Sequence, residues 1–209
     1  MRKVYVVGPE KHYSAWLYDH TLVDKVEDAD IVLFTGGEDV DPSLYDCEKH
    51  STTHSNIRRD LREKAIFEKV RPDQACIGIC RGSQFLCVMN GGKLVQNVGG
   101  HAMFGTHEIR SFTRSATYDI TSTHHQMQYP FNLREHTDYT PLFYSRRRLS
   151  MYYEGDGIEE PPYEPEIVLY HRDGKPKCLA IQGHPEMMVA NPNTPTIPML
   201  NKLVDDYLC

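Results

Sequence analysis

Short apolar runs separated by polar or amphipathic stretches recur along the chain of 209 residues. The apolar runs predict β-strands, because each is bounded by turn residues and is too short for a helix of ordinary length. Ile31–Phe34 is apolar at every position, which is typical of a parallel strand buried on both faces of a sheet. The predicted strands are Val4–Val7, Ile31–Phe34, Ala75–Ile79, Lys93–Val95, Thr117–Thr121, Ile167–Tyr170 and Cys178–Ile181.

The stretches between these runs predict helices. Ser55 or Asn56 is a suitable N-cap for a helix that extends to about Val70. The residues expected on its buried side are Leu61, Ala65, Ile66, Phe67 and Val70. Further helical segments are expected at Ser14–Val26, which is only partly helical, and at Phe85–Asn90 and Pro198–Leu208.

The alternating order of strands and helices predicts the α/β class. We expect a single domain over residues 1–209, with a mostly parallel central sheet that is flanked by helices on both faces. Residues 152–165 are acidic and rich in Pro, Gly and Tyr, which predicts a long surface loop rather than a domain boundary.

The amino-acid composition excludes only a few classes of function. A hydrophobic content of 40% and a charged content of 25% are ordinary for a globular domain, and a net charge of −6 argues against a general nucleic-acid binder. No segment resembles a signal peptide or a membrane span, so a cytoplasmic location is expected. The six cysteines form no C-x-x-C pair, which favours reduced thiols.

One cysteine has the sequence context of a nucleophile. Cys80 follows a predicted strand, precedes a predicted helix and has Gly78 and Gly82 two residues to either side. Glycine at both flanks permits the sharp turn of a nucleophile elbow, because it removes Cβ clashes. The thiol is then placed at a helix N-terminus, where the helix dipole favours the thiolate.

Three separate segments are predicted to meet at one edge of the sheet. The pair Gly36–Gly37, Cys80 and His184 all follow predicted strands, and the carboxyl ends of parallel strands lie together. His184 is then a candidate base for the thiol, with Glu186 holding its imidazole in one tautomer. The backbone N–H groups of Gly37 and Arg81 are candidate oxyanion donors.

Each of these features has an ordinary explanation when taken alone. A buried cysteine is usually packing, and paired glycines are usually a turn. Their conjunction in this order favours a hydrolase-type site.

The other histidines do not predict a metal site from their spacing. His50 and His54 are four residues apart, but the segment between them is a poor helix former and no third ligand is evident. His101 and His107 are six residues apart, and the adjacent pair His124 and His125 is expected to point in different directions. No metal site is therefore expected from these histidines.

At these residues the sequence resembles the class I glutamine amidotransferase-like superfamily, whose fold is flavodoxin-like. It is most similar to the γ-glutamyl hydrolase branch, which includes hydrolases of γ-glutamyl-γ-aminobutyrate. Four blocks carry the resemblance, and they span most of the chain. They are Thr35–Tyr45, Gly78–Gln84 with Gly91–Gln96, Ser122–Gln126, and Gln182–Glu186.

The resemblance implies a role for individual residues. Cys80 would be the nucleophile, His184 the base and Glu186 its partner, with the oxyanion held by Gly37 and Arg81. Substrate contacts are implied for Gln84, which would face the glutamyl group, and for Ser122, His124 and His125, which would lie near its α-amino or α-carboxylate end. The resemblance further implies that a thioester would form, that water would hydrolyse it, and that neither a metal nor an organic cofactor would be needed.

The sequence also departs from the family pattern. Gly183 stands where the family usually has a bulkier residue, often aromatic, and residues 140–165 match nothing recognisable. These departures leave the identity of the substrate open.

Three functional hypotheses follow. The first is a hydrolase that acts alone on a small-molecule γ-glutamyl amide. The second is a glutaminase that passes ammonia to a separate synthetase or amidotransferase partner, because this chain has no synthetase domain. The third, least favoured, is a non-catalytic binding module that has kept the fold.

Overall fold

A mixed sheet forms the centre of the computed structural model, which describes residues 1–191 and 194–209 and every side chain among them except that of Phe104. The sheet has nine strands in the order β2-β1-β3-β4-β13-β12-β10-β7-β8. These strands are β1 (Arg2–Val7), β2 (His20–Leu22), β3 (Ile31–Phe34), β4 (Ala75–Ile79), β7 (Ala102–Ser111), β8 (Thr117–Thr123), β10 (Tyr139–Ser145), β12 (Pro165–Tyr170) and β13 (Lys177–Ile181).

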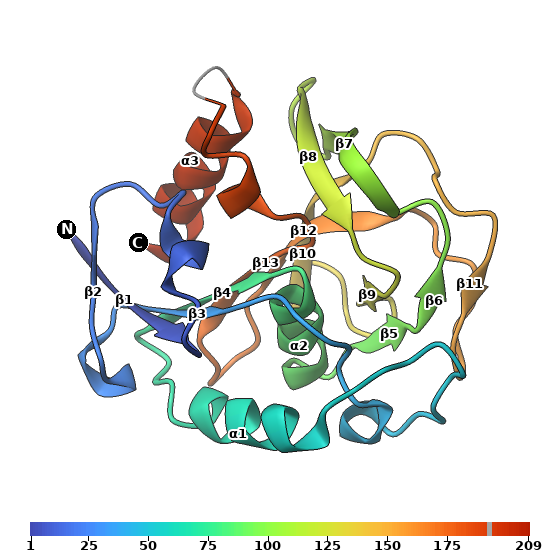
Figure 1. The fold of residues 1–209 in the computed structure, drawn as a ribbon, viewed down its shortest axis with the longest axis horizontal. Helices are drawn as coiled ribbons and strands as arrows, with labels where there is room; N and C mark the ends of the chain where they lie inside the picture. Colours follow the sequence, from blue (N-terminus) through green and yellow to red (C-terminus); the bar gives the residue numbers. More distant parts are fainter. Residues whose placement is uncertain (192–193) are drawn as a thin grey trace.

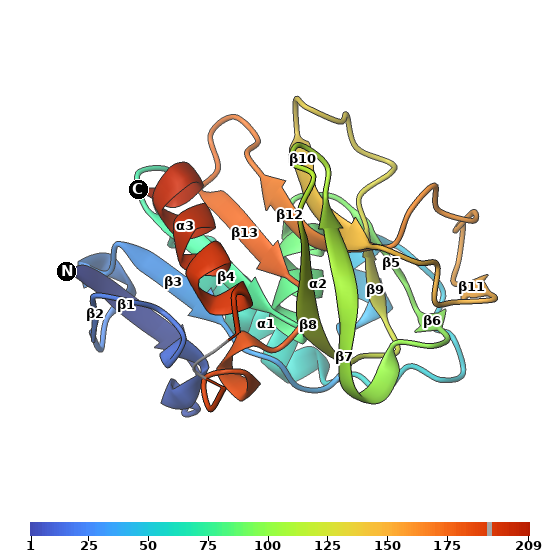
Figure 2. The ribbon, with the colours of Figure 1, turned by 90° about the horizontal axis from the view of Figure 1, so that it is seen from above.

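The sheet has a parallel half and an antiparallel half. Strands β2, β1, β3, β4 and β13 run parallel, and the register pairs Val4 with Ile31 and Ile79 with Ile181. Strands β12, β10, β7 and β8 continue the sheet in antiparallel order. Figure 2 shows this order across the molecule, with the parallel half beneath the C-terminal helix. Strand β3 is apolar and buried at every position, as the sequence predicts.

Helices cover both faces of the parallel half (Figure 1). Helices α1 (Ile57–Phe67) and α2 (Arg81–Met89) pack on one face, where Phe67, Phe85 and Leu86 join a core with Val32 and Phe34. Helix α3 (Thr196–Leu208) packs on the other face, together with the 3₁₀ turn η1 (Lys11–Ser14). The α/β fold with helices on both faces of the sheet is therefore confirmed.

Small elements fill the loops. Two-stranded pairs are formed by β5 (Lys93–Val95) with β9 (Met127–Tyr129), and by β6 (Asn97–Val98) with β11 (Tyr153–Glu154). The remaining 3₁₀ turns are η2 (Val26–Asp28), η3 (Pro42–Tyr45) and η4 (Pro185–Met187). Strand β11 lies within the predicted surface loop, which also contains the buried Glu164. In the described part of the chain, no helix is both long and apolar enough to cross a membrane.

Two local predictions were wrong. Ser14–Val26 holds strand β2 rather than a partial helix, because β2 adds to the sheet edge beside β1 in parallel register. Helix α1 does begin after the predicted cap, since the side chain of Asn56 accepts a hydrogen bond from the Arg59 N–H. Its buried face is only partly the predicted one: Phe67 and Val70 are buried as expected, but Leu61 is 54% exposed and Ala65 is also exposed.

The buried face of α1 instead carries charge. Asp60 and Glu63 are both buried, at 0% and 1% exposure, alongside Phe67. Burying two carboxylates is costly unless cations and hydrogen bonds satisfy them. Their partners lie at the carboxyl edge of the parallel strands.

Candidate active site

Cys80 sits in the sharp turn between β4 and α2. Its backbone has φ 51° and ψ −109°, a region that residues other than glycine rarely adopt. The two flanking glycines make this turn possible. A Cβ on Gly78 would lie 2.4 Å from the carbonyl oxygen of Gly82, and a Cβ on Gly82 would lie 2.2 Å from that of Phe34. The elbow geometry expected from the sequence is therefore present.

His184 meets the thiol from the end of the neighbouring strand β13. Its Nδ1 lies 2.6 Å from Oε1 of Glu186, and Cys80 lies close enough to influence its charge. Burial alone lowers the pKa of His184, but the hydrogen bonds and negative charge of Cys80 and Glu186 outweigh it and raise the pKa to about 10. The imidazole is thus held as a cation between a thiol and a carboxylate at neutral pH.

Strand β8 fixes the backbone of this histidine. The Thr121 hydroxyl accepts a hydrogen bond from the His184 N–H at 2.8 Å and donates one to the His184 carbonyl at 3.0 Å. The glycine that precedes His184 permits this approach, because a Cβ on Gly183 would lie 2.4 Å from Cγ1 of Ile120 and 2.6 Å from the Thr121 carbonyl oxygen. Gly183 therefore allows β8 to pack closely against the segment that carries His184.

The glycine loop after β3 lies beside the imidazole. A Cβ on Gly36 would be 3.1 Å from Cε1 of His184, and Gly37 has a φ of +139°, which favours glycine. Arg59 of α1 braces this loop by donating from Nη2 to the Gly36 carbonyl at 2.8 Å and from Nη1 to Glu38 at 2.6 Å. Gly37 and Arg81, the predicted oxyanion donors, both lie on segments that adjoin the thiol and the imidazole.

A buried ionic network connects the elbow to α1. The Arg81 side chain is 1% exposed, and its two terminal nitrogens pair with Asp60 and Glu63. The second oxygen of Glu63 accepts from Nε of Arg59 at 2.8 Å, which links the network to the glycine loop. Sequence reasoning assigned only the Arg81 backbone; the spacing of Asp60 and Glu63 on one helix face was the signal it missed.

Tyr13 is a second residue that the sequence did not suggest. Its hydroxyl would be 2.7 Å from a Cβ on Gly36, and its ring centroid is 6.2 Å from that of His184. Burial raises the pKa of Tyr13 to about 12, with smaller contributions from the negative charges of Glu186, Glu10 and Cys80. The phenol stays neutral and so keeps a proton to donate beside the site.

The predicted substrate contacts occupy two environments. Gln84 donates from Nε2 to the Gln126 carbonyl at 2.8 Å, and Nε2 of His125 lies 3.0 Å from Oδ1 of Asp39, just beyond the glycine loop. Ser122 and His124 are instead buried behind β8: the Ser122 hydroxyl donates to the His101 carbonyl at 2.5 Å, and the His124 ring packs on the His101 ring. The substrate roles of all four remain predictions.

The fold and this edge of the sheet define a class I glutamine amidotransferase-like protein. Over 99% of its length the chain matches a Thermoplasma acidophilum protein described provisionally as part of a GMP synthase, with 16% identity, a TM-score of 0.58 and 98% of that chain covered. It also matches a glutamine amidotransferase of Thermotoga maritima, with 14% identity, a TM-score of 0.52, and 99% and 84% of the two chains covered.

Within that class, residues 17–137 match the model of the Peptidase C26 family, and the chain belongs to this family. A Mycobacterium tuberculosis protein classed provisionally as a glutamine amidotransferase is 29% identical over 159 residues, which cover 74% of this chain and 50% of that protein. The chain spans about half the length of the curated relatives it matches.

Proposed function

We propose that the protein cleaves a γ-glutamyl amide bond in a small molecule through a thioester on Cys80. One arrangement carries the proposal: the thiol sits at a strained turn beside His184, and Nδ1 of that imidazole lies 2.6 Å from Glu186. A nucleophile, a base and a group that orients the base are what acyl transfer requires.

In this mechanism the Cys80 thiolate attacks the amide carbonyl carbon and the carbonyl π electrons move to oxygen. The backbone N–H groups of Gly37 and Arg81 stabilise that oxyanion. Collapse of the intermediate breaks the C–N bond, and the His184 imidazolium gives its proton to the leaving amine or ammonia. The neutral imidazole then takes a proton from water, which attacks the thioester to release the γ-carboxylate and the thiol.

The other thiols that show a perturbed acidity are poor competitors for this role. Burial raises the pKa of Cys87 to about 12 and that of Cys76 well above its ordinary value, and it also raises the pKa of Cys47. Only the thiolate is an effective nucleophile, so these residues are unreactive near neutral pH. Cys80 differs from them because it lies beside a positively charged imidazole.

The test is to incubate the purified chain with glutamine and a panel of γ-glutamyl amines and to measure glutamate release. Cys80→Ser should abolish turnover while the circular dichroism spectrum is unchanged, and Cys47→Ser should retain it. A glutamine-like electrophile should add to Cys80 in the wild type. Labelling of Cys76 or Cys87, or turnover that survives in Cys80→Ser, would refute the assignment.

The same experiment separates this proposal from ammonia delivery. A hydrolase that acts alone turns over γ-glutamyl amines without any other protein. A glutaminase for a separate synthetase would act on glutamine alone and slowly, and its rate would rise when the synthetase is added.

A further inference from the structure

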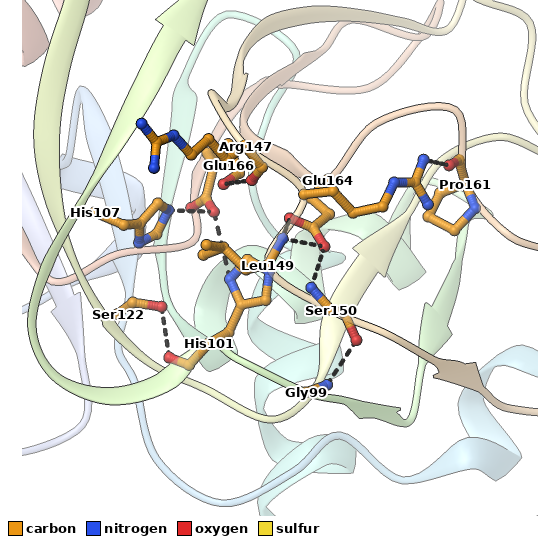
Figure 3. Close-up of polar contacts among 12 residues, drawn as sticks. Gly99, His101, His107, Ser122, Arg147, Leu149, Ser150, Pro161, Glu164 and Glu166 are labelled. Carbon is orange, nitrogen blue, oxygen red and sulfur yellow. Dashed lines mark hydrogen bonds and ion pairs between the residues drawn. The ribbon is translucent and has the colours of Figure 1, made fainter.

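A second cluster of titratable side chains lies behind β8, inside the antiparallel half of the sheet. Its members are all buried: His101 precedes β7, His107 lies in β7, His124 follows β8, and Glu164 and Glu166 come from the start of β12. Figure 3 shows both carboxylates directed toward His101, with His107 on the far side of Glu166. The proposed mechanism uses none of these side chains as a nucleophile, acid or base.

Three of these residues present metal-ligating atoms to one point. One atom each from His101, His124 and Glu166 lies within 4.8 Å of the other two. Nδ1 of His101 is 3.6 Å from Oε1 of Glu166. Two ligands of a tetrahedral zinc ion, each about 2.0–2.1 Å from the metal, are roughly 3.3 Å apart, so side-chain shifts of about 1 Å would close the site.

The unsatisfied atoms of the cluster support this arrangement. Nε2 of His124 and Oε2 of Glu166 are buried and have no hydrogen-bond partner, although His124 is only 4% exposed and Glu166 is fully buried. Buried polar atoms of native proteins almost always have a partner, and a bound ion or water is a common one. A cation coordinated here would supply partners for both atoms.

In His124 and His101, the ring nitrogen that faces away from the proposed metal position lies near an oxygen atom, and this favours the tautomer that can coordinate a metal. Nδ1 of His124 lies 2.8 Å from the Gln126 carbonyl and must donate to it, which leaves a lone pair on Nε2. Nε2 of His101 lies 3.3 Å from Oε2 of Glu164, which favours a proton on Nε2 and leaves Nδ1 free to coordinate. Metal-binding histidines characteristically donate their second N–H to a carbonyl or carboxylate in this way.

The third ligand is positioned similarly. Oε1 of Glu166 lies 2.8 Å from Nε2 of His107, which fixes the carboxylate and leaves Oε2 available. A neutral imidazole and an ionised carboxylate are the forms that bind metal.

We propose that His101, His124 and Glu166 form a binding site for a divalent transition-metal ion of the zinc class. Two imidazoles and one carboxylate suit zinc among the common biological ions, and three protein ligands leave one tetrahedral position to solvent. His101 directly precedes β7, His124 directly follows β8, and Glu166 lies in β12. A bound ion therefore ties the hairpin to the sheet, next to the segment that carries His125 and Gln126.

The experiment is metal titration of the full chain after dialysis against a chelator. Zinc should bind at one equivalent per chain by mass spectrometry of the metal content, and it should raise the melting temperature. Cobalt should give visible d–d absorption without a thiolate charge-transfer band. This spectrum tests the ligand set in the wild-type protein even if a cluster variant fails to fold.

Variants locate the ion. His124→Gln and Glu166→Gln, which conserve much of the shape of each side chain, should weaken zinc binding at least 10-fold. Cys80→Ser, which removes the catalytic thiol, and His54→Gln, which removes an exposed histidine, should bind zinc as the wild type does. Absence of stoichiometric binding, unchanged affinity in His124→Gln, or loss of binding in Cys80→Ser would each overturn the metal proposal and leave the proposed hydrolase activity untouched.

Discussion

Replacing Arg81 by glutamine is expected to destabilise the protein strongly, because it leaves the buried Asp60 without a cation and leaves Glu63 paired with Arg59 alone. Arg81, Asp60 and Glu63 have side-chain exposures of 1%, 1% and 2%. Burial raises the pKa of Asp60 even though the Arg81 charge lowers it, so desolvation already costs more than the ion pair returns. Without Arg81, the free-energy cost of burying the Asp60 charge is no longer offset by an ion pair.

The size of the effect follows from this burial. Removing one partner of a buried ion pair costs about 3–5 kcal/mol, which is a large part of the roughly 5–15 kcal/mol that stabilises a domain. For a chain of this length about 1 kcal/mol shifts the melting temperature by roughly 2–4 °C. The melting temperature of Arg81→Gln should therefore fall by about 6–20 °C.

The assay is urea denaturation at several pH values, with Arg146→Gln as the control. Arg146 also pairs with a carboxylate, at 2.7 and 2.8 Å to Glu108, but both side chains are nearly half exposed, so its loss should cost at most about 1 kcal/mol. Burial already raises the pKa of Asp60, and in Arg81→Gln the Arg81 charge no longer opposes this shift. The penalty of the Asp60 charge is then largest at neutral pH and shrinks as the pH falls and this carboxylate binds a proton.

The reasoning would be refuted if Arg81→Gln lost no more stability than Arg146→Gln, or if its loss were the same at pH 5 and pH 7.5. Either result would mean that Asp60 and Glu63 are not ionised in the folded protein, or that water reaches them.

Two further predictions concern His184. Glu186→Gln removes one of the groups that raise the pKa of His184 to about 10, so this pKa should fall. In a pH–rate profile the basic limb of kcat/KM should then move to lower pH. The rate should also drop about 10²–10⁴-fold. Rates that fall with no movement of the basic limb would contradict this cause. Gly183→Val places side-chain atoms against Ile120 and the Thr121 carbonyl. It should therefore cost about 1–3 kcal/mol of stability, measured by urea denaturation, and it should lower kcat/KM. If neither stability nor kcat/KM changed, β8 would have to shift to accommodate the valine at little cost.

The parallel half of the fold and the residues at its edge could be predicted from the sequence because their signals are local. Fully apolar runs mark buried parallel strands, and glycines two residues from Cys80 mark a turn that needs room. Topology then brings the ends of β3, β4 and β13 together without any knowledge of side-chain packing. The proximity of Cys80 to His184 follows from that topology.

The remaining features depend on contacts between distant segments. Leu61 looks like a core residue of an amphipathic helix, yet α1 turns Asp60 and Glu63 inward because Arg81, some twenty residues away, pairs with both of them. Likewise His101, His124 and Glu166 meet only through the registers that pair β8 with β7, β7 with β10 and β10 with β12. No local pattern encodes such a register.

The antiparallel half is therefore part of the candidate site and not an appendage to it. Thr121 of β8 holds the backbone of His184, and the segment that follows β8 carries the carbonyl of Gln126 to Gln84 of α2. His124 lies between these two contacts, with its ring in the buried cluster. A change in that cluster, such as coordination of a metal ion, would reach both His184 and the predicted glutamyl-binding residues through one short stretch of chain. We therefore expect changes that stabilise or destabilise the β7–β8 hairpin to alter the proposed catalysis as well.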